Sequence, residues 1–414
     1  MRVLILSQYF WPETFRINDV AQGLQERGHQ VEVLTAFPNY PSGQFFAGYR
    51  SVRPKTERLG AIQIRRVPLV SRGHGKGGRL LLNYLSFALS ASLIGAFLIR
   101  KPDVILVFEP SPVTVGIPAA LLRRVFRAPV AFWVQDLWPE SLTATGTVRN
   151  KQILSLVSRM VAWIYSRCDA LLVQSRAFTR SLVAHGVPLS RIEYLPNSAE
   201  AFYRPVIVPV DAPERQLVPQ DGTLNLMFAG NLGVSQDLET LVSAAEQLRS
   251  EPVRWLILGD GRQRPWLEAE IRRRELQGQI HLLGSYPAEA MPRFFALADA
   301  LLVSLKDDLA FEATIPSKLQ SYLACARPVL AMLKGEGARV TTDAGAGLTV
   351  PPEDPAALVQ AVRTFAVLPA AQREAMGQRG RSYFLRHFER EYLLGQLTVV
   401  LSDLSLRAAK EHQA

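Results

Sequence analysis

The chain has 414 residues, of which 48% are hydrophobic and 20% are charged. This is the composition of a globular protein, and the length suits two α/β domains. The two cysteines, Cys168 and Cys325, lie far apart, and the six histidines form no paired motif. These counts argue against a disulfide framework and a cysteine-based zinc site. We therefore expect the protein to reside in a reducing cytosol and to bind no metal. The first residues lack the long apolar run of a signal peptide and resemble a strand.

The net charge of +10 lies in the first half of the sequence. Residues 1–200 contain 24 Lys and Arg against 12 Asp and Glu, whereas residues 201–414 contain 23 against 25. Such asymmetry indicates an anionic partner, either nucleic acid or a phospholipid surface, although an arginine-rich solvated surface is the simpler alternative. Because no nucleic-acid-binding motif accompanies the charge, we expect an anionic membrane surface and no nucleic acid.

Apolar runs alternate with helical spacing along both halves. Residues 17–26 have helical spacing, and Gly28 is a typical residue to end that helix. Alternating strands and helices predict two parallel sheets in tandem, each covered on both faces. The expected strands are residues 3–6, 31–34, 104–108, 130–134 and 170–173, then 224–228, 255–258, 280–283, 300–303 and 329–331.

The two halves are expected to join near Pro196. The proline-rich stretch at residues 205–219 then reads as linker and loop, and residues 381–401 read as an amphipathic helix. Ligands of doubly wound sheets bind beyond the carboxyl ends of the strands, so the loops that follow the strands are the candidate sites.

Residues 80–99 are twenty residues without a charge, which is the length of a transmembrane helix. Strands of one expected sheet lie on both sides of this segment, and a span would separate them. Three interpretations stay open: a span, a buried crossover helix, or a helix docked on the bilayer surface. The neighbouring basic run at residues 72–79 favours contact with anionic headgroups, unless it is a solvated loop.

Residues 311–324, FEATIPSKLQSYLA, follow an expected strand and open a helix. The N-terminus of a helix offers unpaired N–H groups and a positive dipole, which suit a diphosphate. Lys318 lies in the first turn, where a cation suits an anionic ligand, and Glu312 is placed to accept hydrogen bonds from sugar hydroxyls. Plain helix capping by Pro316 and Ser317 is the structural alternative.

The same segment resembles the E-x7-E region of family 4 glycosyltransferases, with Glu312 at the first acidic position and Gln320 at the second. Further strings are similar to the WbuB-type L-fucosamine transferases over nearly the whole chain, namely QYFWPETFRIND (8–19), RGH (27–29), LTAFPNYP (34–41), NYLSF (83–87) and IPSK (315–318).

This resemblance implies a GT-B fold, in which two Rossmann-like doubly wound domains face each other across a cleft. The acceptor domain would comprise residues 1–197 with a returning helix at 388–414, and the nucleotide-sugar-binding domain residues 198–387. It further implies a retaining transfer without metal or other cofactor. A UDP-sugar, N-acetyl-L-fucosamine or a related aminodeoxysugar, would be the donor, and an undecaprenyl-diphosphate-linked glycan the acceptor. The enzyme would work on the cytoplasmic face of the plasma membrane, in O-antigen, capsule or exopolysaccharide synthesis.

The resemblance also assigns site residues. Asn231 and Gln236 stand where many relatives have Arg and Lys on the diphosphate, so we hypothesise that Lys318, with Arg16, supplies the missing positive charge. Glu312, Lys318 and Asp136 are the expected catalytic residues. The expected donor-binding residues are Asn231, Gln236, Gly259, Ser285, Tyr286, Thr314, Ile315, Pro316, Ser317 and Gln320.

In the first domain Glu109 and Asp136 each end an apolar strand and are expected to point into the cleft and orient the acceptor. Structural capping is the alternative for both. Arg16 and Asn18 are placed in the first loop, at the acceptor or cleft. For Gly259, in the loop Gly-Asp-Gly, a tight turn that serves only the backbone is the alternative.

Two other functions stay open. A sugar-nucleotide epimerase or hydrolase of the same fold would need acid and base side chains on both faces of the sugar, and matched pairs are not evident. A non-enzymatic two-domain ligand-binding protein normally carries an export signal, which the sequence does not show.

Overall fold

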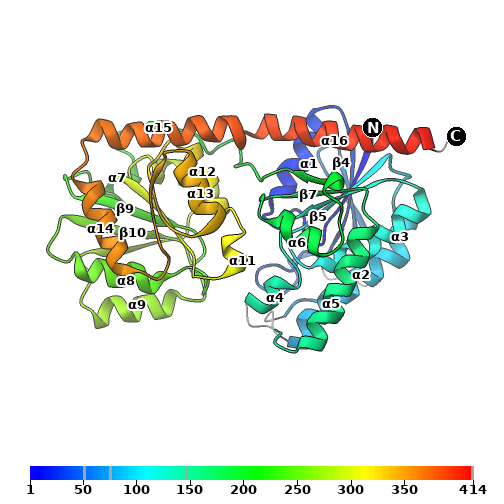
Figure 1. Cartoon of the computed structure of the whole chain (residues 1–414), viewed down its shortest axis with the longest axis horizontal. Coiled ribbons are helices and arrows are strands. Elements are labelled where there is room, and N and C mark those ends of the chain that lie inside the picture. Colours follow the sequence, from blue (N-terminus) through cyan, green and yellow to red (C-terminus); the bar gives the residue numbers. More distant parts are fainter. Residues whose placement is uncertain (50–52, 74–76, 145–147, 412–414) are drawn as a thin grey trace. The chain divides into compact units, whose positions relative to one another are not determined.

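The computed structural model describes residues 1–49, 53–73, 77–144 and 148–411, and the chain divides into two compact units. Unit 1 comprises Met1–Pro196 and Glu391–Ala414, and unit 2 comprises Asn197–Arg390. Each unit is a sheet with helices on both of its faces (Figure 1).

The sheet of unit 1 has eight strands in the order β3-β4-β2-β1-β5-β6-β7-β8. All neighbours are parallel except β3 and β4, which form an antiparallel pair at one edge. The strands are β1 (Arg2–Leu6), β2 (Gln30–Ala36), β3 (Lys55–Leu59), β4 (Ile62–Val67), β5 (Val104–Glu109), β6 (Val130–Val134), β7 (Ala170–Val173) and β8 (Ile192–Tyr194).

The helices of unit 1 cover both faces of this sheet. In the first of them Ile17, Val20, Ala21 and Leu24 are buried, which is the spacing of one helix face. The helices are α1 (Arg16–Glu26), α2 (Gly77–Leu98), α3 (Gly116–Phe126), α4 (Glu140–Ala144), α5 (Lys151–Ser166), α6 (Phe178–Ala184) and α16 (Arg390–Glu411), with short 3₁₀ turns at Val113–Val115 and Leu189–Arg191.

The last helix, α16, completes the core of unit 1. Its residues Leu397 and Leu401 pack in one buried cluster with Val3 and Ile5 of β1. At its start the guanidinium of Arg27 donates to the carboxylate of Glu391, at 2.7 Å. The helix expected over residues 381–401 is therefore wrong in its continuity, because one helix ends at His387 and α16 begins at Arg390.

The sheet of unit 2 has six parallel strands in the order β11-β10-β9-β12-β13-β14. The strands are β9 (Leu224–Ala229), β10 (Val253–Leu258), β11 (Ile280–Gly284), β12 (Ala300–Ser304), β13 (Val329–Met332) and β14 (Gly347–Val350). The helices are α7 (Pro213–Leu217), α8 (Leu238–Gln247), α9 (Arg264–Arg273), α10 (Met291–Phe295), α11 (Leu309–Glu312), α12 (Ser317–Ala324), α13 (Gly335–Asp343), α14 (Pro355–Ala366) and α15 (Ala370–His387), with a 3₁₀ turn at Ala288–Ala290.

The proline-rich stretch before β9 is more ordered than a linker. It contains α7, and Val208, Ala212 and Val218 are buried in a core cluster of unit 2. The expectation of linker and loop is therefore correct for most of the stretch, but part of it packs on the domain through apolar residues between the prolines.

Helix α2 connects β4 to β5 of the same sheet, so the two strands on either side of it belong to one unit. Within the described residues it is the one helix long and apolar enough to cross a membrane. It is bound to its own domain: the Asn83 amide donates to Val70 O at 2.6 Å, and a side chain at Gly95 would meet Leu34 at 2.8 Å. The helix is therefore a crossover within one sheet, which argues against a span, but it is not the buried crossover that was expected, because its outer side is exposed.

We expect α16 to contribute strongly to the stability of unit 1. Replacing the fully buried Leu401 by Ala should reduce the free energy of unfolding by about 2–5 kcal/mol, because it removes core contacts and leaves a cavity. The exposed Leu406, on the same helix, is the matched control, and its Ala variant should stay within about 0.5 kcal/mol of the parent. Urea denaturation measures both variants, and equal losses would contradict the packing described here.

Candidate functional site

Three loops meet at the carboxyl edge of the sheet of unit 2. They follow β9, β10 and β11, and their backbones are joined by hydrogen bonds. Gly230 N donates to Leu258 O at 2.9 Å, Leu232 N to Asp260 O at 2.9 Å, and Gly259 N to Gly284 O at 2.8 Å. These bonds hold the loops in one fixed arrangement where ligands of parallel sheets bind.

Two glycines allow this close packing. Gly259 has a φ of 136°, and a Cβ there would lie 1.9 Å from Gly230 O. A Cβ on Gly261 would lie 2.6 Å from Asn231 Oδ1. Gly259 therefore lets two loop backbones approach each other, which is the structural alternative considered for the Gly-Asp-Gly loop.

Lys318 is directed at the first of these loops. Its ammonium donates to the side-chain oxygen of Gln236 and lies 3.9 Å from the centroid of the Phe228 ring. Within the described residues no carboxylate pairs with it. Burial lowers the pKa of Lys318 to about 7, although part of the side chain remains exposed. The site thus holds a partly exposed cation that contacts an amide and a ring and, within the described residues, no carboxylate.

Glu312 lies at the end of α11, just before α12. Asp308 caps α11 by accepting from Ala310 N at 2.8 Å, and the hydroxyl of Thr314 donates to Ala310 O at 2.9 Å. The loop after β13 packs closely on the backbone of Glu312, since a Cβ on Gly335 would lie 2.0 Å from Glu312 O. The carboxylate of Glu312 is partly exposed and thus accessible to a ligand.

The other expected donor-binding residues divide into exposed and buried ones. Ser317, Asn231, Ser285 and Tyr286 are exposed beside or on these loops, and Tyr286 packs on Phe294.

Ile315, Pro316 and Gln320 are buried, and their expected part in donor binding stays a prediction. Ile315 belongs to the core of unit 2, and the Gln320 amide donates to Asn197 O at 2.6 Å. This bond ties α12 to the start of the unit, whereas the Oε1 atom of Gln320 has no hydrogen-bond partner within the described residues and remains an acceptor.

In unit 1 the two strand-end carboxyl groups differ from each other. Asp136 is partly exposed and accepts from the hydroxyl of Ser141, and burial raises its pKa to about 6. Glu109 is fully buried and, within the described part of the chain, lacks a hydrogen-bond partner for its carboxyl oxygens. Burial, together with the nearby charge of Asp136, raises the pKa of Glu109 well above its usual value. The carboxyl group of Glu109 is therefore not exposed, and its expected role at the acceptor stays a prediction.

The expectation for the first loop also changes. The Asn18 side chain accepts from Trp11 N at 3.0 Å and donates to Glu13 O at 2.8 Å. These bonds shape the loop between β1 and α1, so the amide of Asn18 is a structural group. Arg16 is the first residue of α1.

Sequence reasoning missed a polar and aromatic cluster at the same edge of unit 1. Tyr9 stacks on Phe15 with 4.9 Å between ring centroids, and the guanidinium of Arg72 donates to the Tyr9 hydroxyl at 3.0 Å. The buried Glu13 carboxylate accepts from the backbone N–H of Tyr40 at 2.7 Å, and burial raises its pKa to about 7. The string QYFWPETFRIND, which contains Tyr9 and Glu13, stood out in the sequence, but nothing in it indicated that Arg72 would lie beside Tyr9.

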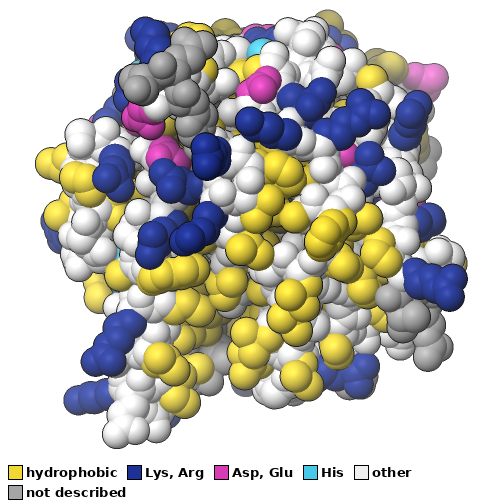
Figure 2. Space-filling view, turned by 90° about the vertical axis from the view of Figure 1, so that its right-hand side faces the viewer, with side chains coloured by type: hydrophobic (Ala, Val, Ile, Leu, Met, Phe, Trp, Pro, Cys, Tyr) yellow, Lys and Arg dark blue, Asp and Glu magenta, His cyan; other side chains and the backbone are white. Residues whose placement is uncertain are grey.

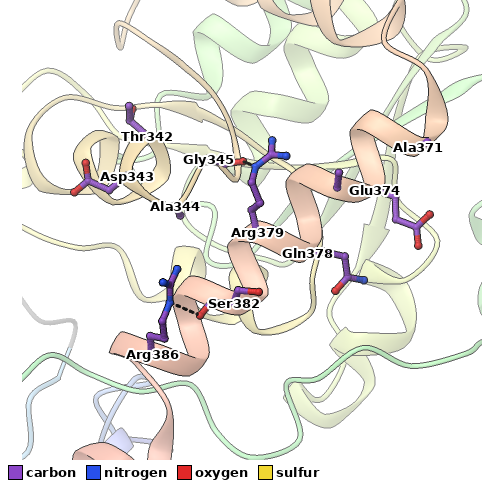
Figure 3. Close-up of a pocket in the computed structure, with 11 residues that line it drawn as sticks. Thr342, Asp343, Ala344, Gly345, Ala371, Glu374, Gln378, Arg379, Ser382 and Arg386 are labelled. Atoms are coloured by element: carbon purple, nitrogen blue, oxygen red, sulfur yellow. Dashed lines mark hydrogen bonds between the residues drawn. The ribbon is translucent and has the colours of Figure 1, made fainter.

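A separate depression of about 760 Å³ lies at the opposite, amino edge of the sheet of unit 2. Figure 3 shows Arg379 of α15 directed at Gly345, whose carbonyl accepts from its guanidinium at 2.9 Å. Asp343 and Gly345 precede β14. Because ligands of parallel sheets bind at the carboxyl edge, we do not assign the donor to this depression. No group of His, Cys, Asp and Glu able to hold a metal ion occurs among the residues that the structure describes.

Two family models match the chain in tandem. The "Glycosyl transferase 4-like domain" matches residues 14–198, and "Glycosyl transferases group 1" matches residues 223–366. The chain is a glycosyltransferase of the GT-B fold, with a glycosyl transferase 4-like domain followed by a glycosyl transferases group 1 domain.

Two curated relatives agree with this assignment. The Escherichia coli (strain K12) "Putative colanic acid biosynthesis glycosyl transferase WcaI" is 28% identical over 410 residues, which cover 96% of this chain and 98% of the relative. The "Probable glycosyltransferase WbjE" of Pseudomonas aeruginosa is 28% identical over 272 residues, which cover 64% of this chain and 66% of the relative. Among solved structures, Anabaena Alr3699/HepE in complex with UDP superposes with a TM-score of 0.71 at 15% identity, covering 97% of this chain and 100% of the other.

The close approach at Gly259 predicts a large effect of a single methyl group. Gly259→Ala should lower the glycosyltransferase kcat/KM at least tenfold, because the Cβ would push the loops after β9 and β10 apart. Gly278 has open space around it, and Gly278→Ala is the matched control that should leave kcat/KM unchanged. Steady-state kinetics tests both, and wild-type kinetics for Gly259→Ala would contradict the loop geometry.

Proposed function

We propose that this glycosyltransferase binds a UDP-sugar at the carboxyl edge of unit 2 and transfers the sugar to a lipid-linked glycan. The observation that carries the donor site is the buried ammonium of Lys318, which faces the loop after β9 without a carboxylate partner among the described residues. The negative charge of a diphosphate would pair with this ammonium. The UDP complex of the structurally similar Anabaena protein supports the choice of nucleotide.

The start of α12 would bind the same diphosphate. This helix begins at Ser317 with no side-chain cap, so its N-terminal dipole faces the ligand together with the Lys318 ammonium. Two groups of positive potential then stabilise the negative charge that grows on the leaving diphosphate. Glu312, on the preceding turn, would accept hydrogen bonds from the sugar hydroxyls.

This arrangement assigns the catalytic work to electrostatics and positioning. Lys318 takes the place of the Arg and Lys that many relatives carry where this chain has Asn231 and Gln236, and no metal is needed in the proposal. The retaining outcome and the use of N-acetyl-L-fucosamine, or a related aminodeoxysugar, rest on the resemblance of the sequence to L-fucosamine transferases. Polysaccharide synthesis is the setting named for the E. coli relative.

The acceptor would bind at the carboxyl edge of unit 1. Asp136, with a pKa of about 6, is ionised at neutral pH and would orient the acceptor hydroxyl. An undecaprenyl-diphosphate-linked glycan fits the excess of Lys and Arg in the first half of the chain. The enzyme would then act in the cytoplasm, as a peripheral protein on the inner face of the plasma membrane, in O-antigen, capsule or exopolysaccharide synthesis.

Loss of the Lys318 ammonium should weaken the donor site specifically. Lys318→Ala should raise the KM for the UDP-sugar or lower kcat by a factor of about 10–1000, because one charge-assisted contact to the diphosphate is lost. The exposed Lys410, on α16, provides the matched control Lys410→Ala, which should have wild-type kinetics. Unchanged kinetics in Lys318→Ala would contradict the assignment.

The lowered pKa of Lys318 predicts a pH dependence of donor binding. Bound diphosphate favours the charged ammonium, so the affinity for a UDP-sugar should be highest below pH 7 and fall as the pH rises through the free-site pKa of about 7. Between pH 7 and 8.5 the loss should approach tenfold or more. Isothermal titration at several pH values measures it, and Lys318→Gln should bind weakly with no such slope.

Dependence on the acceptor separates transfer from hydrolysis or epimerisation. Release of UDP from the UDP-sugar should require added lipid-linked acceptor and should yield a product with one more sugar. Mass spectrometry of the lipid product tests this directly. Release of UDP without acceptor would support a hydrolase or epimerase, and no effect of any nucleotide on the protein would support a different ligand.

A further inference from the structure

Helix α2 carries an apolar stripe on its outer face. Leu81, Leu85, Leu89, Leu93 and Phe97 follow one another at intervals of four residues, and all five are exposed. The exposed fraction reaches 62% at Leu93 and 88% at Phe97. Residues four apart are neighbours on the surface of a helix, so the five side chains form one continuous stripe that winds around the outer side. A helix that only covers a sheet has polar residues on its outer face, so the stripe needs a partner.

The apolar surface continues onto two neighbouring helices. α2 packs against α3, and α3 packs against α5. Leu121 and Val125 of α3 and Leu156 and Trp163 of α5 are exposed. Figure 2 shows hydrophobic side chains gathered in a broad band on this side of the molecule, with Lys and Arg around it. We call the outer surface of α2, α3 and α5 the apolar face.

A groove of about 840 Å³ lies within the apolar face. Its floor and walls are mainly aliphatic, with Trp163 on one side and arginines among its lining. Such a volume suits a small ligand or the hydrocarbon chain of a lipid. The lining residues are Leu85, Ala88, Leu89, Ser92, Ile117, Ala120, Leu121, Arg123, Arg124, Trp163 and Arg167.

The charges of the apolar face have one sign. The sequences of α2, α3 and α5 contain no Asp or Glu, whereas they contain Arg79, Arg123, Arg124, Lys151 and Arg159. Anionic headgroups supply the negative charge that this surface lacks.

The arginines that line the groove differ in what they contact. Arg123 is paired with Asp169 at 2.7 Å, and Arg167 stacks on Trp163 with 5.8 Å to the ring centroid. Arg124 has no ion pair within the described part of the chain. It is therefore the arginine of the groove best placed to bind a phosphate.

The sign of the charge also argues against a second copy of the chain as the partner. Two such faces placed together would oppose arginines to arginines without an acid to pair them, and like charges across an interface are unfavourable. The inner side of α2 is bound to its own domain through Asn83 and Gly95, so the helix lies along the surface and presents only one side.

We propose that the apolar face docks on an anionic phospholipid bilayer. The stripe of α2 enters the interfacial layer, the groove receives a hydrocarbon chain of one membrane lipid, and Arg124 binds that lipid's phosphate. This inference rests on the membrane location in the proposed function and names the surface that achieves it. The donor site of unit 2 contributes no residue to it.

Binding to vesicles tests the docking surface. The full-length protein should sediment with vesicles of phosphatidylglycerol and phosphatidylcholine, less with phosphatidylcholine alone, and less in 0.5 M salt. The variant Leu89→Ser/Leu93→Ser/Phe97→Ser should lose at least tenfold in partitioning. The matched control Ile207→Ser/Val210→Ser/Val367→Ser removes three similarly exposed residues from unit 2 and should bind as the parent does. Circular dichroism and melting temperature verify that each variant is folded.

Two further measurements test the groove. Lipids with brominated chains should quench the tryptophan emission of the parent, and Trp163→Phe should remove the quenched component. Arg124→Gln should weaken binding to anionic vesicles several-fold, whereas Arg272→Gln on α9 should not. Equal quenching in Trp163→Phe, or wild-type binding of Arg124→Gln, would overturn the groove assignment.

Failure of this inference is distinguishable from failure of the donor site. The stabilisation of the protein by UDP, followed by its melting temperature without vesicles, should be the same in the parent and the triple serine variant. If the parent does not bind vesicles while UDP still stabilises it, only the docking surface is wrong. If the triple variant changes a dimer into a monomer and leaves vesicle binding intact, a second copy covers this face and the proposal is overturned.

Discussion

The candidate site depends on the partly buried ammonium of Lys318, which has no carboxylate beside it among the residues that the structure describes. Removing a cation from water costs free energy unless an opposite charge replaces the lost hydration. The ammonium of Lys318 contacts the amide of Gln236 and the ring of Phe228, and burial lowers its pKa to about 7. A bound anion would therefore stabilise the charged form of Lys318. The three joined loops and the uncapped start of α12 surround that point with backbone groups.

The proposed donor site lies in unit 2 and the proposed acceptor site in unit 1. In unit 2 the parallel strands bring loops together that are far apart in sequence, so a diphosphate site can form from residues 230–236, 259–261 and 314–318. In unit 1 the corresponding edge holds carboxyl groups with raised pKa values and a stacked pair of aromatic rings. A leaving diphosphate needs positive potential, which the site of unit 2 offers. An incoming hydroxyl needs a hydrogen-bond acceptor, which the carboxyl groups of unit 1 offer.

Much of the architecture could be predicted from sequence because buried parallel strands are continuous apolar runs. Two clear examples are the apolar runs Val104 to Phe108 and Ala300 to Val303, which form β5 and β12. The edge strand β3 was missed because it carries charged residues. Its neighbour β4 was missed because the fully buried Arg66, paired with Glu57, interrupts the apolar pattern. β14 was missed because it is short and begins at a glycine. The glycosyltransferase family was predicted correctly from its strings.

From the sequence, the donor segment could be proposed as a site, and its role stays a prediction. Lys318 and Glu312 stood out because their segment opens a helix after a strand. The burial of Gln320 and Glu109 could not be predicted, because a polar residue at the right spacing looks the same in the sequence whether it faces a ligand or the core. Arg72 beside Tyr9 depends on a contact between residues 63 positions apart, which only the fold reveals.

Hydrogen–deuterium exchange of the full-length protein with and without UDP tests the central claim most directly. We predict that saturating UDP slows amide exchange in residues 230–236 and 314–320, and leaves the depression lined by Gly345 and Arg379 unchanged. Protection centred on that depression, or no protection in unit 2 at saturating UDP, would contradict the assignment of the donor site to Lys318 and the loops around it.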